Sequence, residues 1–142
     1  MSGELHQNGK LLAKIISAGE FKRGLDIVTD RGDYIQVLTM NYHIWHTIKA
    51  HRHTHRPRTV DKTQEAIVVL QGSVEVTTFG DDNKVVDVRL LKAGDIYILF
   101  NGGVEYRTTK NDTKMVEIKP GHYIVNSDDE DRELIQNDGN VQ

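Results

Sequence analysis

Short runs rich in β-branched and aromatic residues recur along most of this chain, separated by clusters of Gly, Asn and Asp. The runs are spaced roughly ten residues apart, and no segment keeps a 3.6-residue apolar period over three helical turns. We therefore expect strands rather than helices. The predicted strands cover residues 11–17, 25–29, 34–40, 42–49, 66–70, 74–79, 85–91, 96–100, 104–109 and 115–119.

The turn residues indicate how these strands are connected. Gly80-Asp81-Asp82-Asn83 separates two of the runs, and these residue types tolerate the positive φ that tight hairpin loops require. Many short strands joined by such turns are typical of an all-β sandwich or barrel. Nothing reads as a repeat or a linker, so we expect one β-barrel domain at residues 1–125 and a separate tail at residues 126–142.

Composition narrows the class of protein. A chain of 142 residues is the usual size of one domain. No apolar run approaches the ~20 residues of a membrane-spanning helix, and the polar N-terminus lacks the apolar stretch of a secretory signal. The absence of cysteine excludes disulfides and thiolate metal sites. We expect a cytoplasmic protein with no membrane partner.

The charge is distributed unevenly. The tail at residues 126–142 holds six acidic side chains against Arg132 alone, a formal charge of −5, which leaves +2 on residues 1–125 of a chain whose net charge is −3. A run of one sign is usually a solvated chain end, and a docking role for the tail is the alternative. The mild charge of the body argues against nucleic acid as a partner.

Three alternating histidines are the first sign of chemistry. In an extended strand His51, His53 and His55 share one face, about 7 Å apart. Glu65 opens a strongly apolar run, where a carboxylate is costly unless it is paired, hydrogen-bonded or bound to metal. Two imidazoles and one carboxylate suit non-haem iron and related divalent ions. An exposed polar strand end and a structural carboxylate are the alternatives.

The spacing beyond these residues carries a family resemblance. Glu65 is followed by six residues and then Gly72, and Leu91-Lys92-Ala93-Gly94-Asp95 forms a second turn signal. The pair resembles the E-x6-G half of the first cupin motif and the Gly-Asp turn that opens the second. A smaller cupin group shares further positions, which here are His51, His53, Arg58, Thr63-Gln64-Glu65, Gly102-Gly103 and Gly121-His122-Tyr123.

The resemblance implies a single-domain cupin-type β-barrel, a jelly roll, over most of the chain. It implies a divalent metal ion, with Fe, Zn, Ni and Mn as candidates, held by His51, His53 and Glu65, and a small-molecule ligand. Cupins often form homodimers through an N-terminal strand. The run at residues 11–17 is a candidate for that strand, although it could equally close its own sheet.

The first motif also departs from the cupin pattern. Eleven residues separate His53 from Glu65, where cupins have three or four, so the chain must loop out around Pro57. Counting from His55 leaves nine, so His55 stays an alternative to His51 as a ligand.

The second motif departs further, because Phe100 replaces its proline and its histidine is missing. The histidine position falls on Val104 by the smaller group's spacing and on Glu105 by the general spacing. If Val104 faces inward, the site has lost a ligand. If Glu105 faces inward, the ligand set becomes two histidines and two glutamates.

The remaining candidates line the expected barrel mouth. Glu105 and Tyr106 are candidates for the catalytic acid or base, and Arg58, Gln64 and Tyr97 are candidates for substrate binding, with a surface arginine and aromatic packing as the alternatives. The function that follows is a metal-dependent cupin of the dioxygenase, isomerase or lyase type. A non-catalytic cupin that binds a sugar or sugar nucleotide is the alternative, and a protein that binds partners through its acidic tail is the third.

Overall fold

The structure is a computed structural model that describes residues 1–121 and 133–136. It is all-β, with antiparallel pairing throughout the described strands and one 3-10 turn, η1 (Ala18–Glu20). The strands are β1 (Gly3–Gln7), β2 (Lys10–Ile16), β3 (Gly24–Ile27), β4 (Leu38–Asn41), β5 (Glu65–Gln71), β6 (Ser73–Phe79), β7 (Val85–Lys92), β8 (Ile96–Leu99), β9 (Gly103–Thr108) and β10 (Lys114–Ile118).

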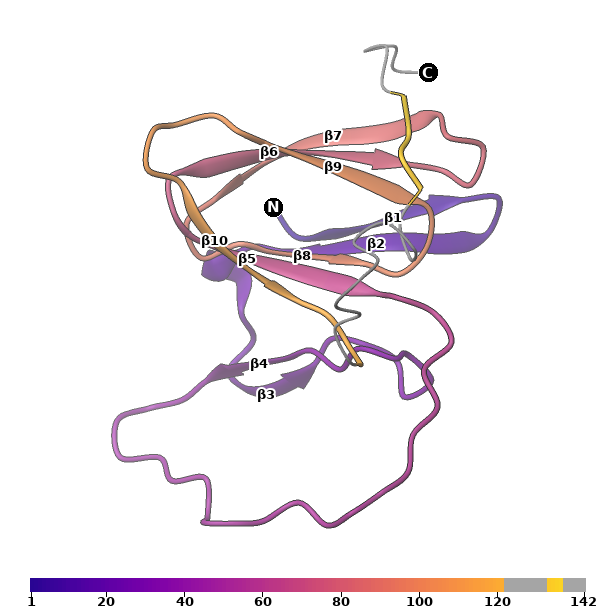
Figure 1. The fold of residues 1–142 in the computed structure, drawn as a ribbon. Coiled ribbons are helices and arrows are strands. Elements are labelled where there is room, and N and C mark those ends of the chain that lie inside the picture. Colours follow the sequence, from indigo (N-terminus) through magenta and orange to yellow (C-terminus); the bar gives the residue numbers. More distant parts are fainter. Residues whose placement is uncertain (122–132, 137–142) are drawn as a thin grey trace.

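Three sheets are stacked in layers (Figure 1). The middle sheet has five strands in the order β1-β2-β8-β5-β10, with the three-stranded sheet β7-β6-β9 on one face and the β3–β4 pair on the other. None of the sheets formed by the described strands closes into a barrel. The all-β prediction is therefore confirmed, whereas the closed jelly roll stays a prediction.

The layering explains the unbroken apolar run that follows Glu65. Ile67 and Val69 pack with the three-stranded sheet, whereas Ala66 belongs to a second apolar cluster on the opposite face, with Val68 packed against its edge. Alternate residues of a strand point to opposite faces, so a strand covered on both sides needs apolar residues at every position. The second cluster includes Ile35, which lies between β3 and β4.

A glycine closes the turn from β5 to β6. Gly72 has φ of 78°, and a Cβ there would lie 2.4 Å from Thr113 Oγ1. Glycine is therefore required on both conformational and steric grounds, which gives the Glu-to-Gly spacing a structural reason. The predicted hairpin around Gly80 is confirmed, since β6 pairs with β7 along their whole lengths.

The N-terminal hairpin was missed from the sequence. β1 is largely polar, yet it pairs with β2 through a turn at Asn8 and Gly9, whose φ angles of 52° and 76° fit a type I′ turn. The Asn-Gly dipeptide was the available signal. β2 lies inside the middle sheet between β1 and β8, and the homodimer stays a prediction.

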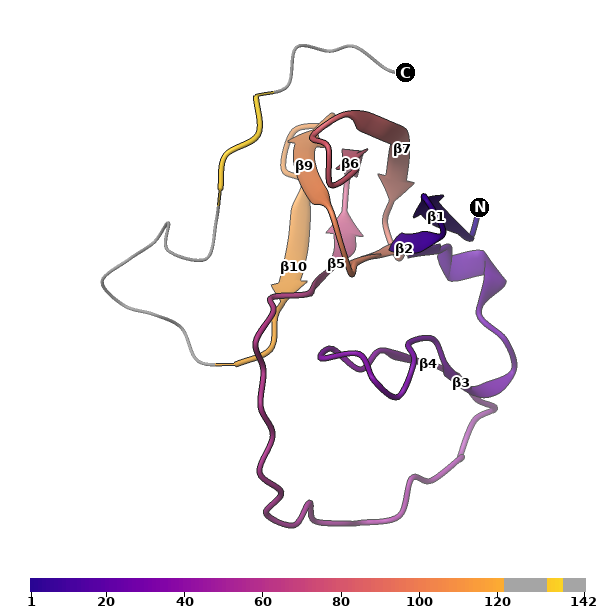
Figure 2. The same ribbon diagram turned by 90° about the vertical axis from the view of Figure 1, so that its right-hand side faces the viewer.

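The strand prediction at residues 42–49 is wrong. The chain between β4 and β5 has no regular secondary structure and arcs away from the sheets (Figures 1 and 2), and every residue from 43 to 63 is exposed. A strand needs a neighbour to complete its hydrogen bonds, and this segment has none in the described structure.

Most of the predicted acidic tail lies outside the described residues. Of residues 126–142, the structure describes only 133–136. No helix in the described part of the chain is long and apolar enough to cross a membrane.

Candidate functional site

A cavity of about 590 Å³ is lined by residues of both the middle and the three-stranded sheets. Its walls come from β5, β8, β9 and β10, from the β6–β7 turn, and from the C-terminal residues 133–135. Apolar and polar groups both line it, among them Leu99, Val104, Glu65, Tyr106 and Lys119. A concave site of this size, with a few converging polar groups, is the usual form of a small-molecule site.

Glu65 is the central ionisable group of the cavity. It is the first residue of β5, pairs in register with Leu99 of β8, and is half-buried. Its carboxyl accepts a hydrogen bond from the Tyr106 hydroxyl at 2.9 Å and lies beside the carboxyl of Glu117. Strand pairing places all three together, since Glu117 of β10 lies opposite Ile67, two residues along β5 from Glu65.

Burial raises the pKa of Glu65 to about 7, and the Glu117 carboxyl acts in the same direction. Tyr106 and Lys119 act in the opposite sense, because a donated hydrogen bond and a nearby cation both favour the carboxylate. Glu65 therefore changes its protonation state near neutral pH, which is rare for a carboxyl group.

Tyr106 is a neutral hydrogen-bond donor. Burial, and next the charge of Glu65, raise the pKa of its hydroxyl well above the usual range. Its ring meets Tyr97 edge to face, with ring centroids 6.2 Å apart. Tyr97 is itself fully buried and its hydroxyl lies 2.7 Å from that of Thr78, so it supports the floor beneath Tyr106 and does not line the cavity.

The two possible second-motif positions are now distinguished. Val104 packs against the apolar cluster between the middle and three-stranded sheets and lies opposite the buried Thr78. Glu105 is an exposed residue that lines the cavity. Val104 therefore has the inward position, the reading in which the histidine ligand is lost.

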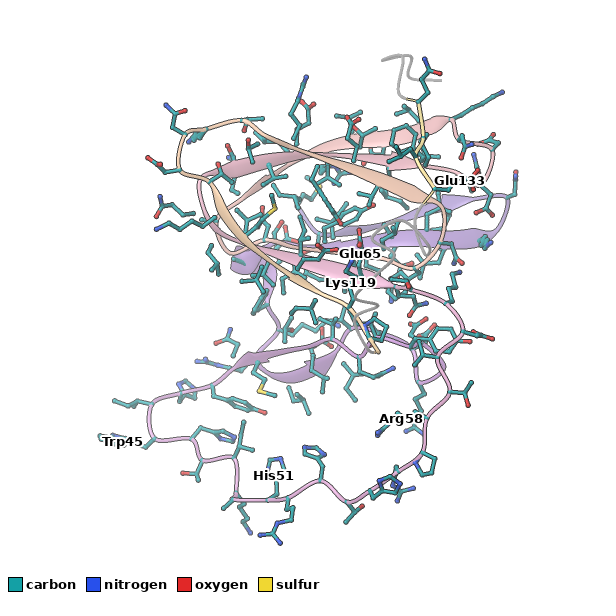
Figure 3. The ribbon with its side chains drawn as sticks, viewed as in Figure 1. Trp45, His51, Arg58, Glu65, Lys119 and Glu133 are labelled. Carbon is teal, nitrogen blue, oxygen red and sulfur yellow. The ribbon has the colours of Figure 1, made fainter. Side chains whose placement is uncertain are left out.

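The histidines lie elsewhere. His51 and His53 are exposed on the long loop between β4 and β5, residues 43–63, with ring centroids 5.2 Å apart in an edge-to-face arrangement. His51 Nδ1 lies 2.8 Å from the Lys49 carbonyl oxygen. Figure 3 shows His51 far from Glu65, which lies on β5 in the middle sheet. His55 is also exposed. Within residues 1–121 and 133–136, no three His, Asp or Glu side chains are grouped to hold a metal ion.

The predicted substrate-binding residues are also divided. Arg58 is exposed on the long loop, away from the cavity (Figure 3). Gln64 is buried, and its Oε1 accepts hydrogen bonds from the backbone N–H groups of Tyr34 and Ile35 at 2.9 and 3.2 Å. The Gln64 side chain thus anchors the end of the loop to the β3–β4 layer.

Glu117 and Lys119 are site residues that sequence reasoning missed. They alternate on one edge strand and its extension, and both line the cavity. In the sequence, Glu117 and Lys119 alternate with apolar residues, as the charged residues of any strand with one face in solvent do. Only the register of β10 against β5 places them beside Glu65.

The C-terminal residues close one side of the cavity. Glu133, Leu134 and Ile135 belong to its lining, and Ile135 Cδ1 lies 2.2 Å from the position that a Cβ on Gly103 would occupy. The absence of a side chain at Gly103 therefore creates the notch that Ile135 fills.

Comparisons with models of known families, with curated proteins and with solved structures find no match for this chain. The resemblance to cupins accordingly rests on the motif residues alone.

Proposed function

We propose that this protein binds a small molecule in the cavity beside Glu65 and that Glu65 exchanges a proton with it. The observation that carries the proposal is the Glu65 carboxyl, which lines the cavity, accepts a hydrogen bond from Tyr106 and has a pKa raised by burial to about 7. An acid or base is most effective when its pKa lies near the working pH.

The neighbouring groups have distinct roles in this proposal. The Tyr106 hydroxyl fixes the orientation of the carboxyl through its hydrogen bond to Oε1. Lys119 supplies a cation at the same wall, suited to an oxygen of the ligand that becomes more negative as a proton leaves carbon. This chemistry corresponds to the isomerase or lyase type rather than to oxygenation.

Binding without catalysis is the second candidate. It is favoured by Val104, which has the inward position where the resemblance implies a histidine. A sugar or sugar nucleotide is the ligand class that the resemblance suggests for it.

The cupin barrel and its metal ion are proposals that rest on the motif residues alone. The motif spacing supports them, but the grouping of side chains required for a metal ion is not found among the described residues. No step of the proposed chemistry therefore uses a metal.

The proposal is tested by proton exchange. A panel of aldoses, ketoses and keto acids is incubated with the protein in deuterium oxide, and loss of the hydrogen next to the carbonyl group is followed by NMR. We expect exchange in at least one compound with the natural protein, and loss of exchange in Glu65→Gln. Glu75→Gln is the matched control, because Glu75 lies on the other face of β6 from the core residues Val74 and Val76. A panel member that binds without exchanging supports the second candidate instead.

A further inference from the structure

The segment from residue 43 to 63 is the anomaly of this fold. Loops of more than about 15 residues without secondary structure are uncommon in a single domain. This one exposes large apolar side chains, with Ile44 at 79% and Trp45 at 89% exposure, and Ile48 also exposed. Trp45 has φ of 67°, a left-handed conformation that costs a non-glycine residue about 1–2 kcal/mol.

The same segment has the pattern of a strand. Ile44 and Ile48 fall on one face of an extended chain, and Trp45 and Lys49 fall on the other. An extended conformation also relieves the left-handed backbone at Trp45. The segment therefore lacks only a neighbour with which to pair.

A free strand edge lies beside the cavity. β10 pairs with β5 on one side and with no described strand on the other. Every residue of β10 is exposed, and Val116 and Ile118, opposite Val68 and Ala66, extend the apolar face of the middle sheet to its edge. Unprotected edges of this kind accept a further strand.

The long loop at residues 43–63 and the cavity beside β10 are complementary in charge. Residues 43–63 carry five Lys and Arg against one Asp, a formal charge of +4, together with five His. The cavity lining has the opposite character, with Glu65, Asp81, Glu105, Glu117 and Glu133 against Lys119. Complementary charges of this kind steer association and select the partner.

We propose that this protein forms a homodimer in which residues 43–49 of each copy add as a strand to the free edge of β10 in the other. A second copy is the occupant because the segment of one chain arcs away from its own β10 (Figures 1 and 2). Reciprocal exchange makes the interface two-fold symmetric and satisfies both edges at once. The interface does not depend on the acid–base role of Glu65.

Alternate side chains of the added strand point to opposite faces of the sheet, and this decides which of them face the cavity. With Ile44 and Ile48 beside Val116 and Ile118, Lys49 falls on the face that carries Glu117. The same parity continues to His51 and His53 if the strand stays extended. The partner's Lys49 thereby lies on the face that carries Glu117, at the acidic wall of the cavity.

Cross-linking tests the exchange directly, because the natural chain has no cysteine. The single variants Ile44→Cys and Val116→Cys are mixed, allowed to exchange subunits, and treated with a short bismaleimide. We expect a covalent dimer in this mixture. The matched pair Leu90→Cys and Val116→Cys, in which Leu90 is exposed on β7, gives none. A linked monomer in the Ile44→Cys/Val116→Cys double variant overturns the proposal.

Light scattering provides an independent measurement on the unmodified protein. We expect a dimer whose dissociation constant rises at least tenfold in Ile44→Asp/Ile48→Asp and is unchanged in Leu90→Asp. Because Trp45 is the single tryptophan, its emission shifts to shorter wavelength as the dimer forms. A monomeric mass at all concentrations overturns the proposal, as does a dimer that the Ile44→Asp/Ile48→Asp change leaves intact.

Discussion

Tyr106 donates a hydrogen bond of 2.9 Å to Glu65 from the strand on the opposite side of the cavity. The two residues belong to different sheets, β9 in the three-stranded sheet and β5 in the middle sheet. Their contact links the layers where the cavity opens, and it sets the orientation of a carboxyl group that titrates near neutral pH.

Glu65 should make the stability of the protein depend on pH. Its pKa in the folded state, about 7, lies above the usual 4.5, so the folded state holds the proton more tightly than the unfolded chain. The free energy of unfolding therefore decreases as pH rises from about 4.5 to 7. After allowance for solvent screening, we expect a decrease of about 1–2 kcal/mol.

Urea unfolding at pH 5 and pH 8 measures this effect. Glu65→Gln, which cannot ionise, should lose most of the difference, whereas the control Glu75→Gln keeps it. An unchanged difference in Glu65→Gln contradicts the assignment.

Tyr106→Phe should raise the pKa of Glu65 further. The hydroxyl stabilises the carboxylate form, and its loss removes a charge-assisted hydrogen bond. Carbon-13 NMR of the glutamate carboxyl groups follows the titration, with Glu65→Gln assigning the signal. Tyr34→Phe is the control, since Tyr34 contacts Asp61 away from the cavity. A lower pKa in Tyr106→Phe contradicts the geometry.

The effects of substitutions at Gly103 and Ile135 on stability should depend on each other. A Cβ at Gly103 meets the end of the Ile135 side chain, so Gly103→Ala should destabilise the fold by about 1 kcal/mol and should be nearly neutral in an Ile135→Ala background. Gly102→Ala should cost more, about 2–3 kcal/mol, in either background. At Gly102 the φ is 77° and a Cβ would lie 2.2 Å from the Phe79 carbonyl oxygen.

A double-mutant cycle measured by thermal unfolding checks this coupling. If Gly103→Ala has the same effect in the natural chain and in the Ile135→Ala variant, residues 133–136 do not occupy the notch.

The resemblance to cupins predicts one divalent ion per chain, whereas the described structure places His51 far from Glu65 and groups no ligand set. His51→Ala and His53→Ala should each remove it, and the control His6→Ala should not, because His6 lies beside Glu4 on the outer strand β1. Elemental analysis of untagged protein provides the measurement. A metal content well below one ion per chain contradicts the prediction.

Local patterns were sufficient for most of the strands. Residues 66–70, 74–79 and 85–91 contain apolar side chains and turn residues that specify β5, β6 and β7 without reference to the rest of the chain. The same logic failed at 42–49, because alternation shows that a segment can form a strand but not whether a partner strand is available. β1 was missed because its residues are mostly polar and show no strand pattern. It forms a strand because the Asn-Gly turn brings it beside β2, with which it pairs.

The sequence by itself determined the all-β class, the glycine after β5, and Glu65 as a carboxylate that required an explanation. Only the tertiary structure decided which groups meet that carboxylate. Tyr106 and Glu117 are 41 and 52 residues away along the chain, and strand register alone brings them to it. Side-chain proximity across sheets depends on pairing and layer stacking, which are properties of the whole fold, so no local pattern in the sequence specifies it.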